Sequence, residues 1–164
     1  MLTIFMDVIR GLSSSACPRK DVIQAISRLM LTILKTRSDS TLLPLLGLFA
    51  LALSELTSFM LDTDWIHALD TEVCWDAYQR VVEELTSSRL REKTHTYLIQ
   101  VLGMYASHKM WSKRNVPTMV RQYSLDCVDV MLSIMKDYEK DHLNASLATS
   151  AKAVLKMIVD RRSQ

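Results

Sequence analysis

The chain has 164 residues, of which 49% are hydrophobic and 23% charged, and its 20 Lys and Arg against 18 Asp and Glu give a net charge of +2. This apolar fraction excludes a disordered chain, and only three Gly and three Pro exclude a collagen-like or linker sequence. The nearly balanced charge argues against a dedicated nucleic-acid-binding arm. The length favours a single domain, 1–164, or one segment of a longer helical protein.

The first half of the chain shows apolar residues at helical spacing between short polar turns. Helices are predicted over 2–12 and about 18–35, and the polar residues 38–41 supply N-caps for a third helix over about 42–61. The most apolar run, 42–53, is 12 residues long, whereas a membrane span needs about 20. We therefore expect a buried helix there and no membrane span.

The second half continues this pattern. Helices are predicted over about 71–85, 86–111 and 117–138, and the polar pair 140–141 separates a last helix through 147–158. No stretch alternates with period two for long enough to form a strand. The sequence therefore predicts an all-α fold of about seven helices.

A short motif recurs within the chain. Residues 46–50 (LGLFA) return as 102–106 (LGMYA), and the same offset of 56 aligns the helices that precede them. Glycine inside a helix costs about 1 kcal/mol relative to alanine, so we expect Gly47 and Gly103 to mark the close approach of a neighbouring helix. The recurrence predicts a duplicated helical hairpin.

Short connections between consecutive helices predict stacked antiparallel hairpins at about 18–61, 71–111 and 117–160. This pattern resembles a segment of an armadillo/HEAT-type α-helical repeat (α-solenoid) over about 18–159. The resemblance is one of architecture and implies a protein-binding scaffold. No functional residue carries over from it, because no family motif matches position by position. A closed helical bundle is the alternative arrangement.

The three cysteines, Cys17, Cys74 and Cys127, are widely spaced and odd in number. This usage favours reduced thiols in an intracellular protein, of the cytoplasm or nucleus, over a disulfide framework. Cys74 and Cys127 lie on apolar stripes, so we expect both of them in the core.

No set of catalytic, cofactor-binding or metal-binding residues stands out. The glycines are too far apart for a phosphate-binding loop, and the Cys and His residues lack zinc-ligand spacing. His67 lies in a connection and is expected at the surface. Glu139 and His142 form one Glu-x-x-His motif where a di-iron bundle needs two, so we expect a solvated helix end there. We predict no enzyme, no cofactor and no metal.

Two basic clusters lie near predicted turns. The first consists of Arg89, Arg91 and Lys93. In the second, Trp111 is accompanied by Lys109, Lys113, Arg114 and Arg121. These cations could hold a nucleic-acid backbone while Trp111 stacks on a base, but they also complement the dipole at a helix C-terminus. We favour the role at the helix end.

The predicted function is a non-catalytic protein–protein interaction scaffold or adaptor within an intracellular assembly. Exposed aromatic residues carry much of the binding energy of interfaces, which favours Trp111, Tyr105, Met104 and Trp65 as partner contacts. The alternatives are binding of a nucleic-acid backbone through the basic turn at 109–121, and a bundle groove that receives a partner helix.

Overall fold

The computed structural model describes residues 20–61, 71–87, 89–108 and 116–162, together with Asp7. These residues contain helices and turns and no strand, so the all-α prediction is confirmed for them. The helix expected over 2–12 lies outside the described residues, apart from Asp7.

Seven α-helices of ten or more residues occur in the described part of the chain; six of them correspond to predicted helices, and α9 is additional. In chain order the elements are α2 (Lys20–Thr36), α3 (Asp39–Leu42), η1 (Leu43–Leu45), α4 (Leu46–Met60), α6 (Thr71–Leu85), α7 (Arg91–Ser107), α8 (Thr118–Ile134), α9 (Asp137–Ser146) and α10 (Thr149–Arg162). The short 3-10 helix η1 contains Pro44, which has no N–H to donate to a preceding turn.

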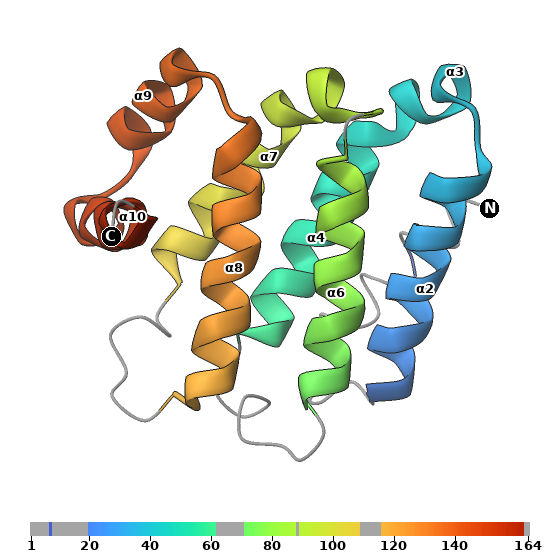
Figure 1. The fold of residues 1–164 in the computed structure, drawn as a ribbon, viewed down its shortest axis with the longest axis horizontal. Helices are drawn as coiled ribbons and strands as arrows, with labels where there is room; N and C mark the ends of the chain where they lie inside the picture. The colour runs from blue at the N-terminus through green and yellow to red at the C-terminus, as the bar shows by residue number, and fades with distance from the viewer. Residues whose placement is uncertain (1–6, 8–19, 62–70, 88, 109–115, 163–164) are drawn as a thin grey trace.

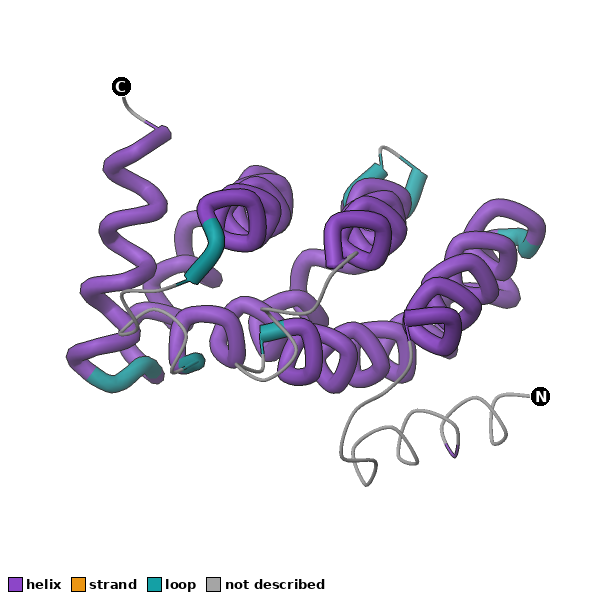
Figure 2. The backbone as a smooth tube through the Cα atoms, turned by 90° about the horizontal axis from the view of Figure 1, so that it is seen from below, coloured by secondary structure: helices purple, strands orange, loops and turns teal. Residues whose placement is uncertain are grey.

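The helices lie in two rows. One row consists of α2, α6 and α8, which run side by side, and α4 and α7 form the second row behind it (Figure 1, Figure 2). Helix α2 packs on α6, α6 packs on α8, and α4 packs on α7. Helix α10 lies across the end of the rows and contacts α7 and α8. The row of α2, α6 and α8 therefore has one face against the second row and one outer face.

The core fills the space between the two rows. Its largest fully buried side chains include Phe49 from α4, Trp75 and Tyr78 from α6, and Tyr105 from α7. The ring of Trp75 meets Tyr78 edge-on and stacks on Tyr123 of α8, with centroids 5.7 and 6.5 Å apart. Burying one large apolar side chain stabilises a fold by about 1.5–3 kcal/mol, so these aromatic residues are principal contributors to the packing of the rows.

The break between α8 and α9 lies earlier in the chain than predicted. Helix α8 ends at Ile134 and α9 begins at Asp137, so the expected separator, 140–141, is inside α9. The reason is a cap: a Glu139 carboxylate oxygen accepts the backbone N–H of Lys136 at 3.0 Å. This contact satisfies one of the unpaired amides at the start of a helix. The expected hairpin at 117–160 therefore contains three helices.

The apolar stretch Asp39–Met60 includes α4, which lies in the second row and packs on α7. By length and composition alone it could also cross a membrane. Half of its most apolar 18-residue window is buried inside the fold, as in the core helices of many soluble proteins. The expectation that the chain has no membrane span stays a prediction.

The two glycines of the recurring motif each face a later helix. A Cβ atom at Gly47 would lie 3.4 Å from the Tyr97 ring, and one at Gly103 would lie 3.9 Å from Leu143. Both distances are those of ordinary van der Waals contacts. Neighbouring helices do meet these positions, but the expectation that close approach requires glycine is wrong.

Candidate functional site: the groove between α2 and α6

Five of the expected contact residues lie outside the described residues: Trp65, Lys109, Trp111, Lys113 and Arg114. The basic turn at 109–121 is therefore described only at its end, from Val116 onward. The partner-binding roles assigned to these five side chains stay predictions.

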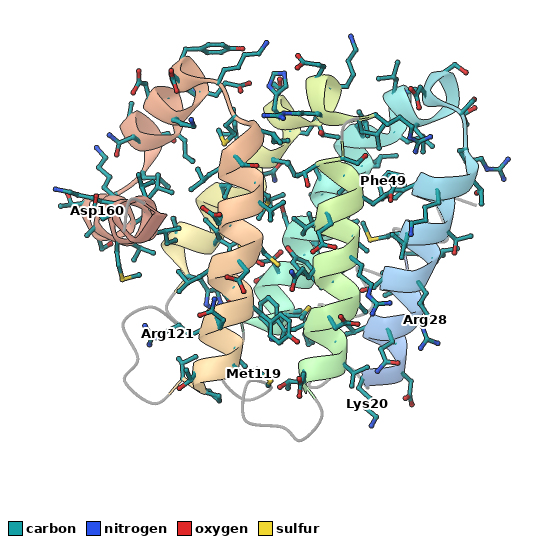
Figure 3. The ribbon with its side chains drawn as sticks, viewed as in Figure 1. Lys20, Arg28, Phe49, Met119, Arg121 and Asp160 are labelled. Carbon is teal, nitrogen blue, oxygen red and sulfur yellow. The ribbon has the colours of Figure 1, made fainter. Side chains whose placement is uncertain are left out.

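The described members of the expected site do not form an exposed patch. Tyr105 is fully buried, so its assignment as a partner contact is wrong. Met104 beside it is half-buried. Arg121 is also half-buried and lies near the lower end of α8 in Figure 3, with α6 between it and the labelled Arg28 of α2.

Tyr105 belongs to a buried polar cluster with Thr57, Tyr78 and Cys127. The Tyr78 hydroxyl donates to Thr57 Oγ1, which itself donates to the Leu53 carbonyl at 2.6 Å. Burial raises the pKa of the Cys127 thiol and of the Tyr78 hydroxyl well above their usual ranges, because the buried anions would lose hydration. Both groups stay protonated at neutral pH, and the prediction that Cys74 and Cys127 are core residues is confirmed.

The first basic cluster acts at helix ends. Arg89 donates to the carbonyls of Leu34 and Arg37 at the end of α2, and its guanidinium lies 3.3 Å from Asp39. Arg91 donates to the Ser133 carbonyl near the end of α8, at 3.2 Å. The last carbonyls of a helix have no partner within it, and cations there also complement the dipole. Arg89 and Arg91 thus fasten the α6–α7 turn to the two neighbouring helices of the row.

A buried hydrogen bond between a histidine and a carboxylate links α7 to α9, and no pattern in the sequence predicts it. His95 Nδ1 lies 2.6 Å from Glu139 Oε1, with the two side chains 9% and 2% exposed. Burial disfavours the Glu139 carboxylate, but the N–H of Lys136, His95 and the Thr96 hydroxyl together hold its pKa below the usual range. The expectation of a solvated helix end is therefore wrong for Glu139, although His142 is exposed.

A groove of about 100 Å³ runs along the outer side of the contact between α2 and α6. Its lining residues are Gln24, Ser27, Arg28 and Leu31 from α2 and Val73, Asp76, Ala77 and Arg80 from α6. On each helix these residues follow the spacing i, i+3, i+4, i+7, which places them on one stripe. Because both helices run in the same direction in Figure 1, the two stripes face each other along the groove.

The polar residues that line the groove are Gln24, Ser27, Arg28, Asp76 and Arg80. Arg80 pairs with Asp76 one turn earlier, at 2.9 Å. The exposed Arg28 forms no hydrogen bond or ion pair through its guanidinium within the described part of the chain. The hydroxyl of Ser27, a residue that is 1% exposed, also lacks a hydrogen-bond partner among the described residues. The groove therefore presents one positive charge without a partner among the described residues, and the Ser27 hydroxyl lies beneath its surface, closed to solvent.

Apolar atoms complete the groove. Leu31 and Ala77 are half-buried, and Val73 is 48% exposed. No group of three or more His, Cys, Asp or Glu residues that could hold a metal ion occurs among the described residues. Such a mixture of apolar and singly charged groups can bind a side chain of another molecule by burial and by one charge-assisted hydrogen bond.

Comparisons with known proteins do not identify a family. No family model matches the chain, and neither a curated protein nor a solved structure matches it.

Proposed function

We propose that the chain is a non-catalytic scaffold that binds another protein through the outer face of α2 and α6. The observation that carries this proposal is the exposed guanidinium of Arg28, which has no partner within the described part of the chain and lies beside apolar side chains of the groove. A charged group beside partly exposed apolar side chains can bind a second molecule through one charge-assisted hydrogen bond and through burial of apolar surface.

The size of the groove favours a protein over a small-molecule substrate. Ligand pockets are clefts of about 300–1,000 Å³ that enclose most of their ligand. A groove of about 100 Å³ holds a single side chain of a larger partner. The proposal therefore includes no enzyme activity.

The two rows support the resemblance to an α-solenoid, which remains part of the proposal. Each helix of the front row packs on the next helix of that row, and the same holds for α4 and α7 behind it. Stacked helical pairs of this kind present long, rigid faces to partners. The two free thiols, Cys74 and Cys127, are consistent with an intracellular assembly in cytoplasm or nucleus.

The test is retention of proteins from cell extract on the immobilised chain, with nuclease present. The variants are Arg28→Glu, the combined reversal of Lys109, Lys113 and Arg114 to Glu, and Lys156→Glu as a control on α10. The proposal predicts proteins that survive nuclease, are lost with Arg28→Glu and are kept by the other two variants. Retention that vanishes with nuclease or with the triple reversal would instead favour the nucleic-acid alternative.

A further inference from the structure

The charges in the α2–α6 groove define the kind of partner it fits. Asp76 pairs with Arg80 at 2.9 Å, which leaves Arg28 as the one charge without a partner among the described lining residues. Arginine binds a carboxylate through parallel N–H···O hydrogen bonds. Arg28 is therefore suited to a single negative group rather than to an extended anionic surface.

The same charges disfavour a phosphate group. A phosphate carries close to two negative charges and is usually bound by a cluster of arginines. Here the second arginine is engaged by Asp76, whose carboxylate would repel a dianion. A carboxylate carries one negative charge, which Arg28 alone can match.

The apolar wall adds a second requirement. Leu31, Val73 and Ala77 line the groove beside Arg28, and Val73 is 48% exposed. An aliphatic side chain placed there would remove this apolar surface from water. The volume of about 100 Å³ limits the insertion to a single aliphatic side chain.

We propose, on the basis of the function proposed above, that the groove binds a partner segment in which an Asp or Glu lies close to an aliphatic residue. The carboxylate pairs with Arg28 at the rim of the groove. The aliphatic side chain packs on Leu31, Val73 and Ala77, above the floor formed by Ser27.

The test begins with selection of peptides from a random display library on the whole chain. The proposal predicts enriched peptides with Asp or Glu within one helical turn of Leu, Ile, Val or Met. For a synthetic peptide of the enriched sequence, Arg28→Ala should weaken binding at least about tenfold, and Lys156→Ala should leave it unchanged. Replacing the acidic residue of the peptide by Asn or Gln should weaken binding as much as Arg28→Ala does. Combining this peptide with Arg28→Ala should weaken binding little further, because both changes remove the same contact.

Three results would overturn the proposal: enriched peptides without an acidic residue, binding that is insensitive to Arg28→Ala, or tighter binding when phosphoserine replaces the acidic residue. If proteins from the extract are retained in the presence of nuclease, but Arg28→Ala leaves peptide binding unchanged, the scaffold function stands and the assignment of the groove is wrong. If nothing survives nuclease there, the scaffold function itself fails. Unfolding temperatures of all variants, measured in parallel, show that a loss of binding is not a loss of fold.

Discussion

The α6–α7 turn and the α2–α6 groove both contain arginines, but they use them differently. At the turn, Arg89 and Arg91 donate to carbonyls of α2 and α8. In the groove, Arg28 has no such partner within the described part of the chain. Two arginines of a dense basic cluster in the sequence thus form contacts within the fold, while an isolated arginine in an amphipathic helix remains available.

The difference follows from where each arginine meets its neighbouring helices. The turn lies beside the C-terminal ends of α2 and α8, where backbone carbonyls lack helical partners and accept hydrogen bonds from a nearby cation. Arg28 lies in the middle of α2, next to the middle of α6, where the backbone groups are already paired. Arg89 and Arg91 therefore bind carbonyls near helix ends, whereas Arg28 stays exposed in the middle of its helix.

The largest effect is expected at the buried pair that joins α7 to α9. Glu139→Ala removes the partner of His95 and the cap at Lys136, so we expect unfolding to become easier by about 3 kcal/mol. Chemical denaturation measures this change. Glu92→Ala, at an exposed position in the first turn of α7, is the control and should cost less than about 0.5 kcal/mol. Equal costs for the two variants would show that the pair contributes nothing specific.

The same pair predicts a pH dependence. Because the folded-state pKa of Glu139 is lowered, its stabilising contribution is present above the unfolded pKa of about 4.3 and is lost as pH falls through the folded pKa. The stability difference between the wild type and Glu139→Gln should therefore shrink as pH is lowered from about 5 to about 3. Denaturation curves of both proteins across this range test it, and a difference that stays constant or grows on acidification would contradict the assignment.

A smaller effect is expected at the α6–α7 turn. Arg89→Ala removes hydrogen bonds to the end of α2 and the pairing with Asp39, so we expect a loss of about 1–2 kcal/mol in the free energy of unfolding. Lys93→Ala, an exposed member of the same sequence cluster, should change it by less than about 0.5 kcal/mol. Thermal unfolding of both variants measures the two losses of stability. An equal loss for Lys93→Ala and Arg89→Ala would contradict the role assigned to Arg89.

The smallest effect on stability is expected in the groove. Arg28→Ala removes a side chain without an internal partner, so the free energy of unfolding should change by no more than about 0.5 kcal/mol. If Arg28→Ala destabilised the protein as much as Arg89→Ala does, Arg28 would have a structural role, and the proposed difference between the turn and the groove would be wrong. The measurement is denaturation of the two variants under the same conditions.

Helical periodicity was sufficient to predict much of the fold. The predicted helix over 71–85 agrees with α6 at both ends, and both described cysteines are buried as expected. On α2 the apolar pattern alone does not locate the buried face: Leu29 is 43% exposed, while Met30 and Leu34 are buried. An apolar residue on the border of a stripe can face either way, because periodicity alone does not locate the neighbouring helix.

The candidate site could not be predicted in the same way. Tyr105 has an aromatic ring and a hydroxyl, a combination that occurs at interfaces as well as in cores. Only its packing beside Tyr78 and Cys127 shows that it belongs to the core. The spacing i, i+3, i+4, i+7 of the lining residues can be seen in the sequence of each helix. Predicting the groove also requires knowing that α2 and α6 are parallel neighbours. The pairing of His95 with Glu139 spans 44 residues and depends likewise on tertiary contact.

The most direct test of the account places a photo-reactive p-benzoylphenylalanine at Val73, in the groove, and separately at Met157 on α10. These side chains have similar exposed fractions, 48% and 45%. After irradiation in cells, the account predicts protein adducts from position 73 that disappear when Arg28→Glu is added, and no matching adducts from position 157. Adducts that form equally at both positions, or that persist with Arg28→Glu, would contradict the claim that partners bind in the α2–α6 groove.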